Sequence, residues 1–324
     1  MVSLRLLMMG TGTFALPTFR ALCASGHDVV GLVTQPDREG RGHHHHPHPM
    51  KEAAVELGVP VFQPENVNSP EALDVLRTLR ADAFIVAAYG QILSAELLGI
   101  PRLGAMNLHG SILPAYRGAA PIQYAVWRGE TETGVTMFRI EPKLDAGPIL
   151  GIVRTPIGPQ ETSGEVHDRL AELSAPFAID VLERLEAGTI EPMVQDRSKV
   201  SKAPKIQKEQ GLIDWSRTRS EIDCHIRAMQ PWPMPFSFLQ SHPALPMRVQ
   251  ILAVRSLEPT STRLPSGEPG SVQPGEDGHL MVCCGDGVVE VLTIQPSGKR
   301  PMSAADFLRG HPLSTNARFV GAPT

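Results

Sequence analysis

The segment that decides the fold of the first half of the chain is Leu4-Arg-Leu-Leu-Met-Met-Gly-Thr-Gly-Thr-Phe-Ala-Leu-Pro-Thr-Phe-Arg-Ala-Leu-Cys-Ala24. Residues 4–9 are an apolar run of strand length, residues 10–15 are a Gly-rich turn, and residues 16–24 are an amphipathic helix closed by Gly26. A second β-branched run follows at 29–34. This order of strand, turn, helix and strand predicts the first unit of a doubly wound α/β sheet.

The same alternation continues downstream. Helices are predicted at 51–57 and from Ser69 to about Arg80, the second opened by the N-cap pair Ser69-Pro70. Strands are predicted at 59–62 and 83–88, and the continuous apolar character of 83–88 is typical of a parallel strand buried on both faces. Thr162 and Glu165 form a capping box for a helix to about Gly188. Residues 1–190 are therefore predicted to form one α/β domain.

The second half of the chain has a different character. Lys199, Lys202, Lys205 and Lys208 recur in a segment that contains Pro204 and few apolar residues, which predicts a basic connector over 191–210. Beyond it come β-rich runs at 248–257, 278–284 and 288–294, the last two joined by a Gly-Asp-Gly hairpin signal. We predict a small antiparallel β-barrel domain over 211–316.

Length and composition agree with a two-domain globular protein. At 324 residues the chain is long for a single hydrophobic core. Its net charge of −4 argues against a uniformly basic protein, but it permits a local cationic patch for nucleic acid. The four cysteines lack zinc-site spacing and are expected to be reduced thiols. The apolar N-terminus is too short for a signal peptide or a membrane span, so we expect a cytoplasmic protein without membrane association.

The candidate chemistry lies in Asn107-Leu-His-Gly-Ser-Ile-Leu-Pro114 and in the turn Leu144-Asp-Ala-Gly147. Asn107 and His109 are two residues apart, so on an extended strand their side chains project from the same face. Asp145 follows a second strand-like run at 134–140. The carboxyl ends of strands are where open α/β sheets place ligands. We therefore expect the three groups to share one site, the alternative being a satisfied polar cluster at a sheet edge.

An amide, an imidazole and a carboxylate suit the transfer of an acyl group. Asn107 can donate a hydrogen bond to a developing oxyanion, and so can a protonated His109. Asp145 can orient the His109 ring, favour its charged form and relay the proton of an attacking amine. We predict direct transfer between two bound substrates, with no metal and no covalent intermediate.

Two other motifs allow different interpretations. Gly10-x-Gly12-x-x-Ala15 fits a dinucleotide fingerprint, which leaves a nucleotide-binding oxidoreductase as an alternative. Against it, the acidic residue expected after the second strand, Asp37, comes late and follows a proline. The small residues at 10–15 are also explained by a tight turn, which needs them without any bound nucleotide.

The run Arg41-Gly-His-His-His-His-Pro-His48 is interpreted as a native loop that binds metal adventitiously or contacts a polyanion.

Together these motifs resemble the methionyl-tRNA formyltransferase family. The matching stretches are Thr34-Gln-Pro-Asp-Arg38 with Arg41-Gly42, Ala88-Tyr-Gly90, Asn107–Pro114, Tyr116–Gln123, Thr133–Thr136, Leu144–Gly147, Gly211–Trp215 and Pro231-Trp-Pro233. The Asn-x-His-x-Ser-x-Leu-Pro core alone is shared by the wider folate-dependent formyltransferases. An enzyme acting on an amino-sugar nucleotide or a glycinamide ribonucleotide therefore stays an alternative, as does a catalytically silent RNA-binding module.

The resemblance implies a Rossmann-like N-terminal domain and a C-terminal OB-like β-barrel that binds tRNA. It implies 10-formyltetrahydrofolate as formyl donor and the α-amino group of methionyl initiator tRNA as acceptor, giving N-formylmethionyl-tRNA for translation initiation; we expect a monomer. The implied catalytic residues are Asn107, His109 and Asp145. The implied folate contacts are Ser111, Ile112, Leu113, Pro114, Ala88, Tyr89 and Gly90.

Contacts to tRNA are expected at two places. The loop around Arg41 is implied to reach the acceptor stem, and the connector lysines Lys202, Lys205 and Lys208 are predicted to track phosphates. The family often has lysines directly after the Arg-Gly pair, where this chain has histidines. Because histidine titrates near neutral pH, we expect tRNA affinity to depend on pH.

Overall fold

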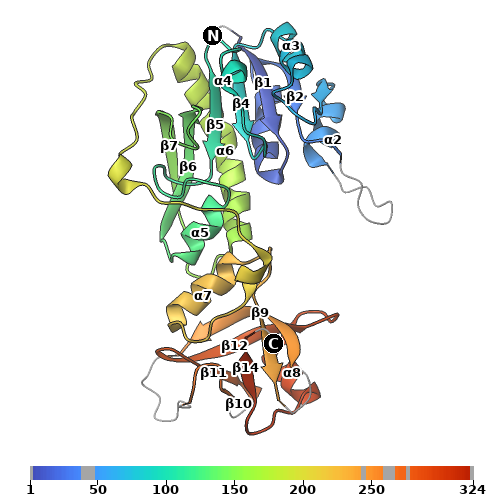
Figure 1. Ribbon diagram of the computed structural model, residues 1–324, viewed down its shortest axis with the longest axis vertical. Helices are drawn as coiled ribbons and strands as arrows, with labels where there is room; N and C mark the ends of the chain where they lie inside the picture. The colour runs from blue at the N-terminus through green and yellow to red at the C-terminus, as the bar shows by residue number, and fades with distance from the viewer. Residues whose placement is uncertain (1–2, 38–47, 242–245, 258–266, 275–277, 322–324) are drawn as a thin grey trace. The chain divides into compact units, whose positions relative to one another are not determined.

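The structure is a computed structural model that describes residues 3–37, 48–241, 246–257, 267–274 and 278–321. It divides the chain into two compact units (Figure 1). The first comprises Met1–Pro121, Glu132–Pro156 and His167–Pro204, and the second comprises Ile122–Thr131, Ile157–Val166 and Lys205–Thr324. The two units are thus interleaved along the sequence.

The first unit is built on a seven-stranded sheet in the order β3-β2-β1-β4-β5-β6-β7. The strands are β1 (Arg5–Gly10), β2 (Asp28–Val33), β3 (Val61–Phe62), β4 (Ala83–Ala87), β5 (Ala105–His109), β6 (Glu132–Arg139) and β7 (Ile149–Pro156). The five strands from β3 to β5 are parallel, whereas β6 and β7 are antiparallel to their neighbours. The change of strand order at β1 and β4 confirms the predicted doubly wound, Rossmann-like fold.

The helices of this part of the chain are α1 (Leu16–Ala24) with the preceding 3-10 turn η1 (Thr13–Ala15), α2 (Pro49–Glu56), α3 (Pro70–Thr78), α4 (Ala95–Leu98), α5 (Pro121–Trp127) and α6 (Ser163–Glu186). Helices α1, α2, α3 and α6 begin and end close to their predicted positions, whereas the sequence does not predict α4 and α5. Ser69 caps α3, because its hydroxyl accepts from the Ala72 amide at 3.2 Å. At the start of α6 the Glu165 amide donates to Thr162 Oγ1 at 3.3 Å, as the capping box predicts, and α6 continues through Pro176.

The first turn shows why small residues are needed after β1. A side chain on Gly10 would bring its Cβ to 2.8 Å from Ala15 Cβ and 2.9 Å from the Ala87 carbonyl oxygen. Real Cβ atoms do not approach other atoms this closely, so packing alone explains Gly10. Next to this turn, all five residues of β4 are buried, as expected for a strand covered on both faces.

The second unit is an antiparallel sheet in the order β10-β11-β12-β9-β8-β14, with β13 paired to β12. The strands are β8 (Phe236–Gln240), β9 (Met247–Ser256), β10 (Val272–Pro274), β11 (Leu280–Cys284), β12 (Gly287–Pro296), β13 (Met302–Ser303) and β14 (Arg318–Val320). The helices α7 (Arg219–Ala228) and α8 (Ala304–Gly310) accompany them, and all of α5 after Pro121 falls in the same unit. Ser271 pairs with Arg318, so the two edges of the sheet meet and the predicted barrel-like domain is confirmed.

Two local features of this unit follow from its sequence. The Gly-Asp-Gly segment joins β11 to β12 as the predicted hairpin, with Cys284 opposite Gly287. Trp215 is buried in the barrel core, where it stacks on Phe319 with 5.2 Å between ring centroids and donates from Nε1 to Ser237 Oγ at 3.1 Å. Across the described ranges, none of the helices has both the length and the apolar character needed to cross a membrane.

Candidate active site

His109 is the last residue of β5 and lies opposite Thr136 of β6. The alternation of side chains along β5 puts Asn107 and His109 on one face and turns Met106 and Leu108 the other way. Met106 and Leu108 are fully packed in the interior, and His109 is 5% exposed. The amide and the imidazole are therefore neighbours on one face of the strand, as the spacing predicts.

Asp145 reaches His109 by a route that differs from the one expected. Because β6 runs antiparallel to β5, its carboxyl end at Arg139 lies beside Met106, near the start of β5. The loop between β6 and β7 then returns the Asp145 carboxylate to His109, with Oδ2 3.9 Å from Nδ1. At Gly147 a side chain would place Cβ 1.8 Å from the Arg139 carbonyl oxygen, so this tight return requires glycine.

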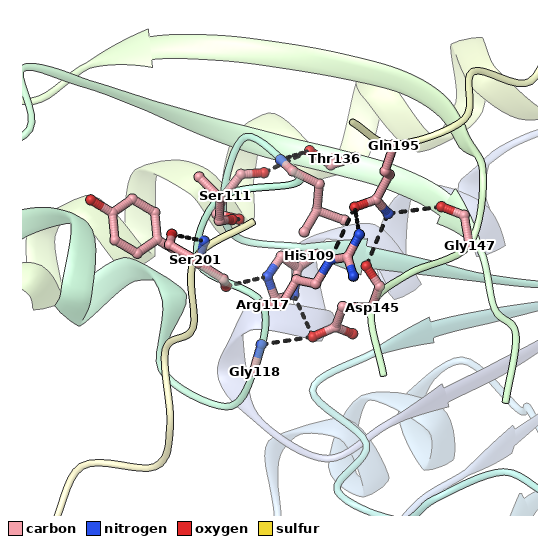
Figure 2. Close-up of polar contacts among 12 residues, drawn as sticks. His109, Ser111, Arg117, Gly118, Thr136, Asp145, Gly147, Gln195 and Ser201 are labelled. Carbon is pink, nitrogen blue, oxygen red and sulfur yellow. Dashed lines mark hydrogen bonds and ion pairs between the residues drawn. The ribbon is translucent and has the colours of Figure 1, made fainter. Parts of the chain in front are cut away.

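Hydrogen bonding determines which nitrogen of His109 carries the proton. Nε2 lies 2.9 Å from the Tyr116 carbonyl oxygen, which can only accept, so Nε2 is the donor (Figure 2). In the neutral ring the lone pair is then on Nδ1, the nitrogen that faces Asp145. Burial lowers the pKa of His109, an effect that the Asp145 carboxylate and the bond to Tyr116 oppose. The ring is thus held neutral with Nδ1 free to accept a proton.

The oxygen of Asp145 that faces His109 is also held by the backbone. The Gly118 amide donates to Asp145 Oδ2 at 2.8 Å, and the Asp145 side chain is only 11% exposed. Gly118 has φ +128°, and a Cβ there would lie 2.4 Å from the Ala203 carbonyl oxygen. Only glycine fits this position, so the backbone that orients Asp145 tolerates no side chain.

The Asn107 side chain is half-buried and, within the described part of the chain, makes no hydrogen bond. Its NH₂ group is therefore open to a ligand. The loop that follows β5 is held by Thr136, whose hydroxyl donates to the Ser111 carbonyl at 2.6 Å and accepts from the Leu113 amide at 3.0 Å. Ser111 Oγ donates to the Ala115 carbonyl at 2.7 Å.

The two segments expected to contact folate lie in different surroundings. Ala88 and Gly90 are exposed and line a hollow of about 1170 Å³, together with Thr11, Gly12 and Gln35. The side chains of Ser111 and Leu113 are buried, and none of Ser111, Ile112, Leu113 and Pro114 is among the described residues that line this hollow. Within this segment only Ile112 and Pro114 have partly exposed side chains.

The Tyr89 side chain faces the interior. Burial raises its pKa to about 12, and its hydroxyl has no hydrogen-bond partner among the residues described. Its ring packs in the core cluster that includes Leu7, Met9 and Val86. The Tyr89 hydroxyl is therefore not directed into the hollow, and the Tyr89 backbone carbonyl accepts from Thr11 Oγ1 at 3.1 Å and Gln35 Nε2 at 3.0 Å.

The same hollow contains Asp37, the acidic residue that a bound ribose would require. One of its carboxylate oxygens pairs with Lys51 Nζ, and the other accepts from Gln63 Nε2 at 3.0 Å. These partners lower the pKa of Asp37, with the hydrogen bond from Lys51 the largest cause. Asp37 is therefore held by residues of its own unit, although its side chain stays half exposed.

The basic residues expected to contact tRNA are only partly described. Arg41 and His43–His46 of the histidine-rich loop lie outside the described residues; His48 caps α2 by accepting from the Lys51 amide at 3.4 Å. Lys202 in the first unit and Lys205 and Lys208 in the second are exposed. They make no ion pair with any residue that the structure describes.

No group of three or more potential metal ligands occurs in the described ranges.

Sequence reasoning missed three polar residues that line the site: Thr136, Gln195 and Ser201. Thr136 could have been found, because it lies inside a strand-like run with its hydroxyl on the face shared with His109. Gln195 and Ser201 belong to the connector, where no local pattern marks them. Figure 2 shows Gln195 beside Arg117 and Asp145, and Ser201 on the other side of His109.

Fold and site together define a formyl transferase, and the chain belongs to this family. The formyl transferase profile matches residues 4–182, and that of the formyl transferase C-terminal domain matches residues 205–312. Among relatives, a protein named methionyl-tRNA formyltransferase from Methylococcus capsulatus is 43% identical over 312 residues, which cover 96% of this chain and 98% of that protein.

Solved structures with lower identity share the fold. WlaRD, described as a sugar 3N-formyl transferase, has a TM-score of 0.65 at 15% identity and matches 93% of this chain and 100% of its own. An N-formyltransferase from Helicobacter canadensis, in complex with folinic acid and dTDP-3-aminofucose, has a TM-score of 0.64 at 17% identity over 90% of this chain and 99% of its own. HypX from Aquifex aeolicus, in complex with tetrahydrofolic acid, has a TM-score of 0.59 at 18% identity; the match covers 95% of this chain but only 47% of HypX.

Proposed function

We propose that the protein transfers the formyl group of 10-formyltetrahydrofolate to the α-amino group of methionyl initiator tRNA. The observation that carries the chemistry is the buried, neutral His109 whose Nδ1 faces Asp145 beside the open amide of Asn107. Membership of the formyl transferase family supports the donor. The 43% identity to the relative named methionyl-tRNA formyltransferase, over nearly the full length of both chains, supports the acceptor.

Asn107 is proposed to stabilise the oxyanion. As the amine nitrogen bonds to the formyl carbon, the carbonyl electron pair moves onto oxygen and creates a negative charge. The Asn107 NH₂ group, which has no partner within the described residues, donates to that oxygen. One such donor is typically worth about 3–4 kcal/mol of barrier.

In place of the expected oxyanion contact and Asp145 relay, His109 is proposed to carry the proton from the amine to the leaving group, because its Nε2–H is already bound to the Tyr116 carbonyl. Nδ1 has the lone pair, so it can accept the proton that the attacking amine loses. The resulting imidazolium faces the Asp145 carboxylate, 3.9 Å away, which stabilises it. When the bond from the formyl carbon to the folate nitrogen breaks, Nδ1 returns the proton to that nitrogen, and no net proton is released.

A labelled-formyl assay tests this proposal. Purified protein is incubated with the folate donor and, separately, with methionyl initiator tRNA, methionyl elongator tRNA and a dTDP-linked amino sugar. We expect label on initiator tRNA. Transfer to the amino sugar alone would overturn the acceptor, and transfer to none of the three would overturn the function.

Lys202, Lys205 and Lys208 are proposed to bind tRNA phosphates, together with Arg41. No described residue neutralises the three lysines by an ion pair. Replacing them by glutamine should weaken tRNA binding and reduce the dependence of affinity on salt, by up to about one counterion for each phosphate that is no longer bound. A salt dependence equal to that of the wild type would exclude this role.

A further inference from the structure

We infer that Gln195 and Ser201, two side chains of the connector, are positioning residues that hold Asp145 and His109 in their reactive arrangement. The inference rests on the proposed function, because it assigns these residues a part in formyl transfer. It gives the connector a second role beside tRNA contact. All residues involved belong to the first unit.

Gln195 is a buried amide with all its hydrogen-bonding capacity in use. It is 5% exposed and lies two residues after Met193, which pairs with Ile149 at the start of β7. Its Nε2 donates to the carbonyl oxygens of Asp145 at 2.9 Å and Gly147 at 2.8 Å. Its Oε1 accepts from Arg117, at 3.1 Å from Nε and 2.6 Å from Nη2.

These partners allow only one orientation of the Gln195 amide. A flipped amide would place NH₂ against the Arg117 guanidinium, which has only donors, and oxygen against two carbonyl oxygens. Gln195 therefore links the Arg117 side chain to the turn that carries Asp145. Neither an apolar residue nor a carboxylate of the same size can make both sets of bonds.

Ser201 acts on the other side of the site. Its hydroxyl accepts from the Tyr116 amide at 2.8 Å, and its carbonyl oxygen accepts from the Arg117 amide at 2.9 Å. Two residues further along, the Ala203 amide donates to the Arg117 carbonyl at 2.7 Å. The connector thus pairs with the segment whose Tyr116 carbonyl accepts from His109 Nε2.

The two residues held by the connector both have strained backbones. Asp145 has φ +47° and Tyr116 has φ +62°, the left-handed region that residues with a side chain rarely adopt. Such conformations persist only where surrounding contacts impose them, and they are common at functional sites. Gln195 contacts the carbonyl of Asp145, and Ser201 contacts the amide of Tyr116.

The connector therefore determines the relative position of His109 Nδ1 and Asp145 Oδ2. Loss of Gln195 removes both bonds to the Asp145 turn. Loss of the Ser201 hydroxyl removes the bond to the Tyr116 amide and loosens the residue whose carbonyl fixes the His109 ring, while the two backbone bonds to Arg117 remain. The charged groups that act on His109 are Asp145 and Arg117, and both are contacted by Gln195. A displacement of about 1 Å in such a site can cost about 10²-fold in rate.

The test compares Gln195→Met, which removes both sets of bonds, with Gln195→Glu, which can still accept from Arg117 but repels the two carbonyls. We expect both variants to lower kcat by about 10-fold to 100-fold with little change in KM. Ser201→Ala should lower kcat as well, and Ser201→Thr, which keeps the hydroxyl, should restore it. Gln295→Met is the matched control, because Gln295 is in the barrel and donates only to the Lys299 carbonyl among the described residues.

A titration of the His109 imidazole by NMR with ¹³C-labelled histidine supplies a readout that is independent of activity. We expect its pKa to move in Gln195→Met and Gln195→Glu and to stay unchanged in Gln295→Met. Wild-type kcat and an unmoved titration in both Gln195 variants would overturn the inference, even if the wild type formylates tRNA. If Gln195→Met fails to fold, an equal kcat for Ser201→Ala and Ser201→Thr would overturn it. If the wild type transfers no formyl group, the proposed function fails, and the titration still decides whether Gln195 positions the pair.

Discussion

His109 and His225 are both buried histidines, one in each unit. They differ in the groups that surround the ring and its Nδ1 atom. Both donate from Nε2 to a backbone carbonyl, His109 to Tyr116 at 2.9 Å and His225 to Gln210 at 2.6 Å. Burial lowers the pKa of both rings. The two side chains are therefore alike in three respects: both are buried, both carry the proton on Nε2, and both have a lowered pKa.

Their neighbours distinguish them. Nδ1 of His109 faces the Asp145 carboxylate at 3.9 Å, next to the open amide of Asn107. The ring of His225 instead packs on Trp127, with 5.4 Å between centroids, and makes no ion pair within the described residues. Asp214 also favours the charged form of His225, but of the two rings only that of His109 has a described carboxylate within 4 Å of its second ring nitrogen, and this contact is what distinguishes the histidine that we propose as functional.

The largest expected effect comes from removing the base. His109→Ala should lower kcat by about 10²-fold to 10⁴-fold, because the amine proton then has no acceptor. Single-turnover formyl transfer measures the loss, and His225→Phe, assayed in parallel, should keep the wild-type rate. Equal rates for the two variants would remove the distinction between the histidines.

Asn107→Ala should have the next largest effect. Without its NH₂ group the oxyanion loses one donor, and kcat should fall by about 10²-fold to 10³-fold. Because Asn107 makes no hydrogen bond with any described residue, the free energy of unfolding should change little. A large loss of stability with normal kcat would make Asn107 a structural residue.

His225→Phe should act on stability rather than on rate. The phenyl ring keeps the packing on Trp127 but leaves the Gln210 carbonyl without its donor. A buried acceptor without a partner costs about 1–3 kcal/mol. Urea unfolding monitored at the barrel unit measures the change, and stability equal to that of the wild type would show that water satisfies the carbonyl.

The smallest effect concerns pH. Because burial lowers the pKa of His225 in the folded state, the unfolded chain binds a proton first as pH falls below about 6.5. The contribution of this group to stability is present above that pH and is lost as pH falls toward the folded-state pKa. His225→Phe should therefore reduce the slope of unfolding free energy against pH by up to about 1.4 kcal/mol per pH unit. An unchanged slope between about pH 7 and pH 5 would contradict this assignment.

Where a pattern is local, the sequence predicts the structure well. The run 4–9, the caps at Ser69 and Thr162 and the Gly-Asp-Gly hairpin all depend on near neighbours, and each is confirmed. The shared face of Asn107 and His109 is equally local, because it follows from the two-residue period of a strand.

Contacts between distant segments are harder to predict. The sequence suggests that Asp145 meets His109 at the carboxyl ends of neighbouring strands, but β6 is antiparallel and a return loop makes the contact. Gln195 is 50 residues from Asp145 and 78 from Arg117 in sequence, and it lies in a segment without periodicity. Nothing in such a segment distinguishes a buried amide from an exposed one before the fold is known.

The pairing of residues 201–203 with Arg117 also limits how the protein can be divided. A fragment that ended at residue 190 would lack Gln195 and Ser201, so a minimal catalytic piece must extend to Pro204, where the first unit ends. The matched C-terminal domain begins at residue 205. Exchange of that domain between relatives by recombination would leave the catalytic unit intact only if the junction fell after Pro204.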